Sequence, residues 1–176
     1  NLRKYLSDKY PGVKGINDKT TTLEQTQWGP AGDLHMSNVT PKGGWGSEIE
    51  GIENRAERSR AIARAFIANE AASLFGTTDT AEYRESKFQA DEYGHYHILY
   101  KRYIGGLPIK KSSIHIHLKN GESIHSMTAT VAAPSPAAYQ AAAKKTISKG
   151  KIRKIIRDDL KSSDPAVSVG VSKAQK

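Results

Sequence analysis

The clearest pattern of hydrophobic and polar positions lies in residues 93–131. Apolar residues at Ile114, Ile116 and Leu118 alternate with polar ones, and a period of two is typical of a strand with one buried face. Asn120-Gly121 predicts a tight hairpin turn, because a primed turn needs positive φ angles that Asn and Gly adopt at little cost. We therefore expect three short strands in an antiparallel meander.

A helical pattern precedes this meander, over residues 53–75. Its apolar positions recur every three or four residues and form one stripe along the predicted helix, at Ala63, Ile67, Ala71 and Leu74. Gly76 follows the pattern and is a typical residue at a helix C-terminus. We expect the apolar stripe to pack on one face of the sheet, because a one-sided helix and a one-sided sheet must bury their apolar faces together.

The predicted sheet has about four strands, in antiparallel order because the connections between them are short. They are expected over residues 83–90, 96–104, 110–118 and 123–131. The predicted fold class is therefore α+β, with a helix packed on an antiparallel meander sheet of about four strands in a cystatin-like arrangement. This core module is expected to span residues 53–133.

The N-terminal segment, residues 1–52, has the least regular pattern. A short helix that begins near residue 1 would end at Pro11-Gly12, and strands are possible within residues 13–27 because of their β-branched threonines. The glycine- and proline-containing stretch 28–46 predicts an extended loop. Its tryptophans, Trp28 and Trp45, would either fold back on the core or anchor a partner.

The C-terminal segment, residues 134–176, is predicted to form a smaller helix–helix–strand unit. Ser135-Pro136 is a typical helix start, and apolar residues at helical spacing within 152–160 indicate a second short helix. Asp164-Pro165 would end this helix, and a strand would follow over 166–171. A lone edge strand normally needs a neighbour, so this unit is expected to be incomplete by itself.

Composition and charge narrow the class of protein. A chain of 176 residues can hold one domain, or one domain and a small second one. It contains no cysteine, which excludes disulfides and thiol chemistry. We expect no membrane partner, because no apolar run approaches the roughly 20 residues that a membrane span needs. The net charge of +9 favours an acidic partner.

Candidate catalytic and metal-binding chemistry is sparse. Five histidines, His95, His97, His115, His117 and His125, are expected in or beside the sheet. A His-x-His pair on a strand puts both rings on one face, a geometry that can hold a metal ion, and His115 and His117 would point away from the apolar face. No carboxylate or cysteine is obviously placed to complete the shell, so ordinary surface histidines are the favoured interpretation. The helical zinc-peptidase motif, the phosphate-binding loop and the Gly-x-Ser-x-Gly elbow are missing from the sequence. We therefore expect neither catalysis nor a cofactor in this chain.

Seven basic residues occur between positions 144 and 157 with no acidic residue before Asp158. A nucleic-acid-binding protein could use such a run to contact phosphates. The stretch has almost no aromatic residues to interleave with the charges, so a solvated basic face is the favoured interpretation. Nucleic-acid binding is kept as a less favoured alternative.

Seven short motifs follow one another in a specific order and spacing over about residues 55–131. They are Ala65-Phe66-Ile67-Ala68-Asn69-Glu70, Leu74-Phe75-Gly76, Asp91-Glu92-Tyr93-Gly94, His97-Ile98-Leu99-Tyr100, Gly106-Leu107-Pro108-Ile109, Ile114-His115-Ile116-His117-Leu118 and Asn120-Gly121. Together they resemble the propeptides of thermolysin-like zinc metallopeptidases, in the module shared by fungalysin and thermolysin propeptides. Residues 135–171 resemble the first half of the second propeptide module.

The chain departs from that family at three places. The family usually has Arg where this chain has Leu99 and Gln where it has Arg102, and it often has Phe-Gly-Gly where this chain has Lys110-Lys111-Ser112. The resemblance implies structural roles for the remaining motif residues, namely Phe66, Phe75, Gly76, Gly94, His97, Tyr100, Gly106, Pro108 and Gly121.

The resemblance implies a prodomain of a secreted or periplasmic zinc metallopeptidase. Such a prodomain would act as an intramolecular folding chaperone and as an inhibitor until it is cleaved off. Its partner would be the cognate peptidase domain, which would hold the zinc. In this family the last propeptide residues tend to occupy the active-site cleft, and the expected partner contacts are Ser172, Lys173, Ala174, Gln175 and Lys176, with His115 and His117 on the sheet.

A second interpretation is a free-standing protein-binding or inhibitor module that acts in trans on a separately encoded peptidase. The reading frame after Lys176 would distinguish the two. A peptidase domain with its zinc motif would favour the prodomain, and a stop codon would favour the free-standing module.

Overall fold

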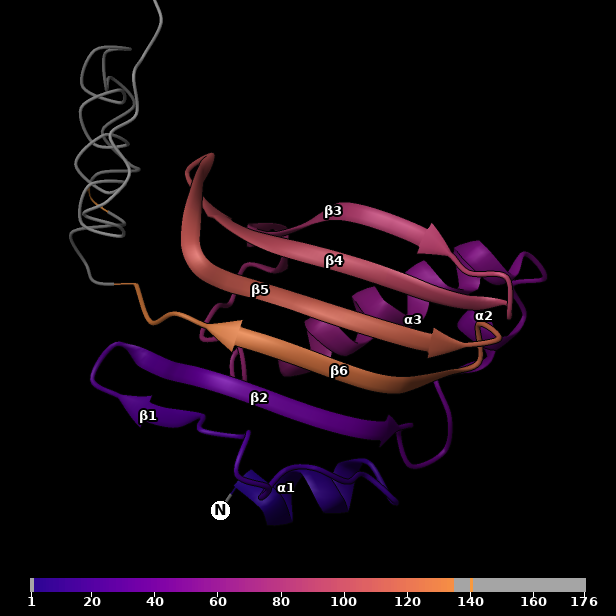
Figure 1. Cartoon of the computed structure of the whole chain (residues 1–176), viewed down its shortest axis with the longest axis horizontal. Coiled ribbons are helices and arrows are strands. Elements are labelled where there is room, and N and C mark those ends of the chain that lie inside the picture. The colour runs from indigo at the N-terminus through magenta and orange to yellow at the C-terminus, as the bar shows by residue number, and fades with distance from the viewer. Residues whose placement is uncertain (1, 135–139, 141–176) are drawn as a thin grey trace, which may run out of the picture. The chain divides into compact units, whose positions relative to one another are not determined.

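A six-stranded antiparallel sheet forms the centre of the described part of the chain (Figure 1). The computed structural model describes residues 2–134 and 140, which belong to one compact unit, Asn1–Ala142. The order across the sheet is β1-β2-β6-β5-β4-β3. The strands are β1 (Glu24–Thr26), β2 (Gly29–Val39), β3 (Tyr83–Ala90), β4 (His95–Ile104), β5 (Leu107–Lys119) and β6 (Ser123–Val131), and the helices are α1 (Leu2–Lys9), α2 (Ser47–Glu50), α3 (Arg55–Glu70) and the 3-10 turn η1 (Thr80–Glu82).

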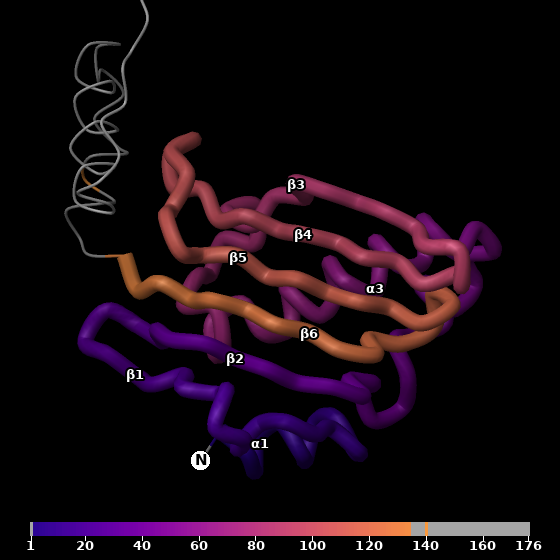
Figure 2. Tube along the Cα trace, viewed as in Figure 1, coloured from indigo at the N-terminus to yellow at the C-terminus, as the bar shows by residue number. Residues whose placement is uncertain are grey.

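Helix α3 lies across one face of the sheet, where it contacts β4 and β6 (Figures 1 and 2). Its start is fixed by Asn54, whose side-chain oxygen accepts hydrogen bonds from the backbone N–H groups of Ala56 at 3.0 Å and Glu57 at 3.1 Å. Such a cap satisfies donors that have no partner within the helix. The helix ends at Glu70, earlier than the predicted residue 75, although Leu74 and Phe75 remain fully buried in the turn that follows.

The alternation predicted for β5 is confirmed. Ile114, Ile116 and Leu118 are fully buried against the helix side, whereas His115 is exposed on the other side. The predicted turn is also confirmed, since Asn120 and Gly121 have φ angles of 55° and 70° between β5 and β6. These two features together fix which face of the meander joins the core.

Helix α1 is attached to the end of α3 by a buried polar cluster. The Glu70 carboxylate is fully buried, and it accepts a hydrogen bond from the Tyr10 hydroxyl at 2.6 Å. The Lys9 ammonium lies 2.7 Å from the same carboxylate. A buried carboxylate needs such partners because its desolvation is otherwise costly. The predicted N-terminal helix is thus confirmed, and it is part of the same packed unit.

The prediction of about four strands is wrong, because β1 and β2 extend the sheet beyond β6. Strand β2 pairs with β6 from Gly32 opposite Val131 to Val39 opposite Ile124. The stretch 28–46 was predicted to be an extended loop on account of its glycines and prolines, yet β2 occupies most of it. Three buried residues, Leu34, Met36 and Val39, hold this strand on the core.

The two tryptophans of this stretch have different environments. Trp28 is exposed, and Trp45 packs against the core as a partly buried residue. The predicted strand at 83–90 and the strand at 123–131 match β3 and β6. The predicted helix–helix–strand unit, residues 134–176, lies outside the described residues except for Pro134 and Gln140.

Candidate partner-binding face

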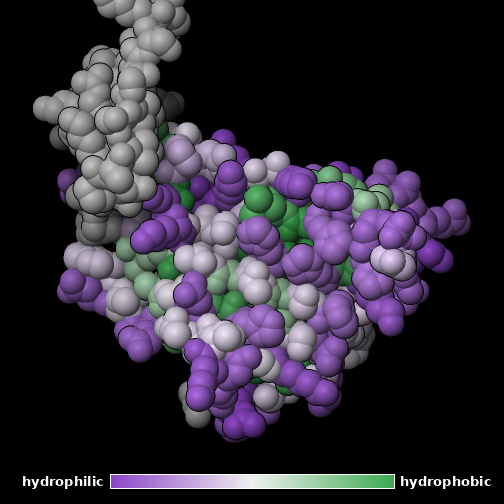
Figure 3. Space-filling view, viewed as in Figure 1, coloured by the Kyte–Doolittle hydropathy of each residue, from purple (hydrophilic) through white to green (hydrophobic). Residues whose placement is uncertain are grey.

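The face of the sheet that points away from α3 carries polar side chains in rows that cross five strands. We call it the open face, because no element of residues 2–134 covers it (Figure 1). Seen from this side, hydrophilic and intermediate residues occupy most of the surface over the strands (Figure 3). Its outward-facing residues are Asp33, His35 and Ser37 of β2, Ser126, Thr128 and Thr130 of β6, Ser113, His115 and His117 of β5, His95, His97, Leu99, Lys101 and Tyr103 of β4, and Arg84, Lys87 and Gln89 of β3.

All six histidines of the chain lie in strands of this sheet. Five of them alternate with buried residues and face outward, and the sixth, His125, is exposed where the pairing of β5 with β6 shifts its register. Imidazole is the side chain whose ordinary pKa lies nearest neutral pH, and it is also a frequent metal ligand. Five of the six imidazole groups of the chain therefore lie on the open face, where they could bind a metal ion or exchange a proton.

His97 and His117 lie directly opposite each other on β4 and β5. Their Nδ1 atoms are 2.6 Å apart, and their ring centroids are 4.8 Å apart in an edge-to-face arrangement. The pKa of His117 is lowered, mainly because burial disfavours the charged imidazolium and secondly because His97 is close. The two rings thus form one hydrogen-bonded unit rather than two independent surface groups.

Asp91 orients this pair from the loop between β3 and β4. Its Oδ1 atom accepts hydrogen bonds from the backbone N–H groups of Tyr93 and His95, each at 2.9 Å. These bonds hold the pKa of the Asp91 carboxyl below its usual value, the His95 bond contributing most. The Oδ2 atom lies 3.0 Å from Nε2 of His97. An ionised carboxylate can only accept, so Nε2 of His97 carries the proton and its Nδ1 is left as an acceptor.

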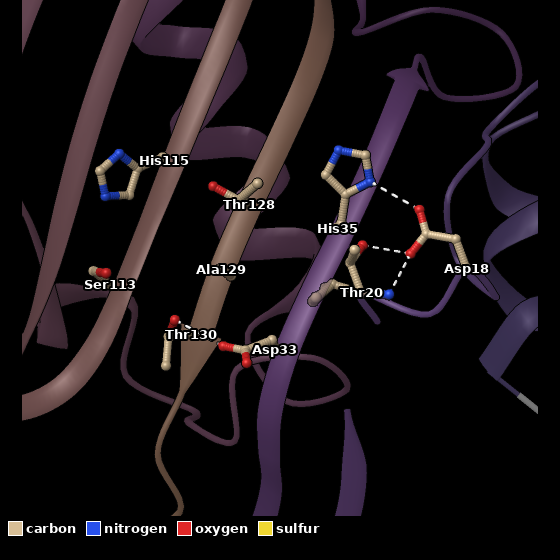
Figure 4. Close-up of a pocket in the computed structure, with 10 residues that line it drawn as sticks. Asp18, Thr20, Asp33, His35, Ser113, His115, Thr128, Ala129 and Thr130 are labelled. Atoms are coloured by element: carbon tan, nitrogen blue, oxygen red, sulfur yellow. Dashed lines mark hydrogen bonds and ion pairs between the residues drawn. The ribbon is translucent and has the colours of Figure 1, made fainter. Parts of the chain in front are cut away.

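A groove of about 540 Å³ lies over β2, β6 and β5 of the open face (Figure 4). At its outer edge Asp18 lies 3.6 Å from Nδ1 of His35 and accepts hydrogen bonds from the backbone and hydroxyl of Thr20. Across the groove the Thr130 hydroxyl donates to Asp33 at 2.9 Å. Hydroxyl, imidazole and carboxylate groups line this groove, so it can form directional hydrogen bonds with a bound surface.

The structure separates the two histidines that the sequence grouped together. His115 lines the groove, whereas His117 pairs across the strands with His97. His97 was predicted as a structural motif residue and as one of five histidines in or beside the sheet, and its contacts with His117 and Asp91 were missed. The five predicted C-terminal contacts, residues 172–176, lie outside the described residues.

Three of the motif residues pack in the core on the α3 side. Phe66 and Phe75 are fully buried with ring centroids 6.0 Å apart, and Tyr100 is 2% exposed. Burial raises the pKa of the Tyr100 hydroxyl to about 12. These residues form the framework under the sheet, so they do not contact anything that binds the open face.

The motif glycines and the proline lie in turns or at strand ends. Gly76 has a φ angle of 61°, and a Cβ atom there would lie 2.9 Å from the ring of Pro30. Gly121 has a φ angle of 70°, and a Cβ atom would lie 2.8 Å from the carbonyl oxygen of Arg55. Glycine is required at both positions because the backbone angle and the close approach exclude a side chain. Gly94 and Gly106 also have positive φ angles in the turns before β4 and β5, and Pro108 lies on β5 opposite Tyr103.

Arg102, one of the departures from the propeptide family, points to the covered side and is fully buried. Its guanidinium group lies 2.8 Å from the Glu82 carboxylate. It also donates to the carbonyl oxygens of Phe75 at 3.1 Å, Gly76 at 3.1 Å and Ala132 at 3.2 Å. Arg102 thus joins the end of the α3 segment to the end of β6, and this substitution leaves the open face unchanged. The other departure on β4, Leu99, faces outward.

In comparisons with known proteins, no family model matches the chain, and no curated protein matches it significantly. Within residues 2–134 and 140, no helix is long and apolar enough to cross a membrane. In the same part of the chain, no group of three or more His, Cys, Asp and Glu side chains is placed to hold a metal ion. The case for function therefore depends on the motifs and on the geometry of the open face.

Proposed function

We propose that the chain is the prodomain of a secreted thermolysin-like zinc metallopeptidase, in which it acts as a folding chaperone and as an inhibitor until it is cleaved. The observation that carries the proposal is the one-sided sheet. Its covered face is closed by α3, while its open face presents polar side chains from five strands. A rigid array of this kind suits a folded partner better than a small ligand.

The size of the open face supports a protein partner. Strands β4, β5 and β6 have 10, 13 and 9 residues. With about 3.3 Å per residue and about 4.8 Å between strands, five strands give a face of roughly 20 by 30 Å. Its area of roughly 600 Å² is close to the roughly 800 Å² that each partner buries in a standard protein–protein interface.

The positions of the motif residues also support the proposal. Phe66, Phe75 and Tyr100 build the covered face, and Gly76 and Gly121 permit close contacts at its ends. The resemblance to thermolysin-like propeptides thus concerns the framework that holds the open face rigid. A preorganised surface binds a partner at lower entropic cost than a flexible one.

A surface of this kind would act on the peptidase in two ways. Binding to native-like peptidase structure would lower the barrier of a slow fold rich in non-local contacts. Binding to the finished enzyme would stabilise the folded enzyme against unfolding. This stabilisation increases with the logarithm of the ratio between the chain concentration and the dissociation constant of the complex. The resemblance assigns the blocking of the cleft to residues 172–176, which follow the described part.

Charge divides the chain into two parts that would contribute differently to binding. Residues 1–134 contain 17 Lys and Arg and 15 Asp and Glu, a net charge of +2. Residues 135–176 contain 10 Lys and Arg and 3 Asp, a net charge of +7. An acidic peptidase surface would therefore be attracted mainly by the C-terminal residues. Affinity that stays constant between low and physiological ionic strength would contradict this electrostatic contribution.

The experiment that tests the proposal is inhibition in trans. The purified chain is added to a thermolysin-like peptidase, and the rate of peptide hydrolysis is followed against chain concentration. Saturable inhibition is expected. Thr128→Arg, which places a large charged group at the centre of the open face, should weaken inhibition at least tenfold because it obstructs contact.

Ala68→Arg provides the matched control, because Ala68 is an exposed residue on α3 and the same group is added on the opposite side. It should leave inhibition unchanged. The proposal is wrong if a folded chain neither inhibits the peptidase nor increases the yield of its refolding. Equal inhibition by both variants would instead show that the open face is not the contact surface.

A further inference from the structure

The cross-strand histidine pair has the arrangement of a small metal site. His97 and His117 place their Nδ1 atoms 2.6 Å apart on the open face, near the turn between β3 and β4. The side chain of His97 is 37% exposed, so an ion can reach the pair from solvent. We propose that His97 and His117 chelate one divalent transition-metal ion of the zinc, nickel or copper class through their Nδ1 atoms.

The tautomer of His97 prepares it for this role. Oδ2 of Asp91 accepts a hydrogen bond from Nε2 of His97 at 3.0 Å, which leaves Nδ1 of His97 unprotonated, with a lone pair that can bind an ion. Metal-binding histidines commonly donate their other ring N–H to a carboxylate, which fixes the ring and makes it a better ligand. Asp91 is itself held by the backbone N–H groups of Tyr93 and His95. It is thus a positioning residue for the site.

Binding needs only a small adjustment of the rings. Because Nδ1 of His97 carries no proton, the hydrogen between the two rings belongs to Nδ1 of His117. For Nδ1 of His117 to bind an ion, that proton must move through solvent to Nε2 of the same ring, so that both ligands remain neutral imidazoles. Metal–nitrogen bonds of about 2.0–2.1 Å require the two nitrogen atoms to move roughly 3.0–3.4 Å apart, from 2.6 Å at present. Rotation of two partly exposed rings can supply this movement.

The ligand set selects the class of ion. Two imidazoles suit Cu²⁺, Ni²⁺ and Zn²⁺, and they disfavour Mg²⁺ and Ca²⁺, which prefer oxygen ligands. Water would fill the remaining coordination positions, because two histidines are the only protein ligands that this geometry provides among the described residues. The order of divalent affinities predicts that Cu²⁺ binds more tightly than Ni²⁺ or Zn²⁺.

Calorimetric titration of the full chain with CuCl2, NiCl2 and ZnCl2 tests the proposal. One ion per chain is expected, displaced by EDTA, with no binding of MgCl2 at the same concentrations. His97→Gln and His117→Gln should each lower the affinity at least tenfold, and the similar size of glutamine keeps the fold. Asp91→Asn should lower it about tenfold, in the range typical of residues that orient a ligand.

Two controls separate this site from other histidine arrangements. His125→Gln should leave binding unchanged, because His125 lies outside the pair. If His115→Gln reduces affinity as much as His97→Gln does, the His115-x-His117 pair on one strand is the ligand set and the proposal is overturned. The ¹⁵N NMR chemical shifts of the imidazole rings provide a second readout. Metal binding is expected to change the shift of Nδ1 in both His97 and His117, and Asp91→Asn is expected to change the tautomer of His97. Metal binding that survives both pair substitutions would also overturn it.

Discussion

The two faces of the sheet are made by alternate residues of the same strands, and they differ in almost every property. On the covered face, β5 contributes Ile114, Ile116 and Leu118, each fully buried. On the open face, the same strand contributes Ser113, His115 and His117. Because successive side chains of a strand point to opposite faces, the residues that stabilise the fold are different from those that remain available for contact with a partner. Substitutions on the two faces should therefore have separable effects.

The largest effect is expected in the core under the covered face. Phe66 is fully buried, with Tyr10 and Phe75 rings at 5.8 and 6.0 Å. Phe66→Ala should lower the free energy of unfolding by about 3–5 kcal/mol, because it removes apolar contacts and leaves a cavity. Denaturant unfolding measures this change, and Phe66→Leu should cost clearly less. An equal loss in both variants would mean that the cavity is not the cause.

A second large effect is expected at the ion pair on the covered side. Arg102→Gln introduces the residue that thermolysin-like propeptides usually have at this position. It should lower the free energy of unfolding by about 3 kcal/mol, because the Glu82 carboxylate and three backbone carbonyl groups lose the guanidinium group that donates to them. Thermal unfolding provides the measurement. Adding Glu82→Gln should restore part of the loss, since no unpaired carboxylate then remains. A double variant as unstable as the sum of the singles would contradict this coupling.

The sequence was informative wherever local chemistry determines structure. Asn120-Gly121 predicted its turn, and apolar alternation at Ile114, Ile116 and Leu118 predicted the outward and inward sides of β5. Strand β2 was missed because glycines and prolines surround it and its buried apolar residues, Leu34, Met36 and Val39, do not keep a strict period of two. Its pairing with β6 is also a contact between residues about 90 positions apart, which local patterns do not encode.

The candidate site was predictable only in part, because it depends on register. The alternation placed His115 and His117 on the outward side, but it could not show which residue of β4 would lie opposite each of them. The register of β4 with β5 shifts between Lys101 and Tyr103, and a slip of one residue exchanges the two faces of a strand. The pairing of His97 with His117, and the position of Asp91 behind it, therefore required the three-dimensional structure.

Alkaline pH provides a smaller test of the covered face. Burial raises the pKa of Tyr100 to about 12, above its ordinary value near 10. A group whose pKa is raised on folding stabilises the protein below its unfolded pKa and loses that contribution as pH rises. Stability should thus fall between about pH 10 and pH 12, by up to about 2 kcal/mol from this residue. Tyr100→Phe should remove its share of that dependence in denaturant unfolding, and an unchanged profile would show that Tyr100 is not responsible.

The smallest effect on stability is expected on the open face, where the comparison between the faces is sharpest. Thr128 is exposed and lies between His35 and His115 across the strands. Thr128→Ser should change the free energy of unfolding by no more than about 0.5 kcal/mol, because the side chain is exposed and the substitution removes only one methyl group. Chemical denaturation measures the change, with the buried Ala129→Ser on the same strand as its matched control. The buried substitution should cost more, since it places a hydroxyl group in the core. If Thr128→Ser proved more destabilising than Ala129→Ser, the open face would contribute to the stability of the fold. Its polar side chains would then have a structural role besides the binding role that we propose.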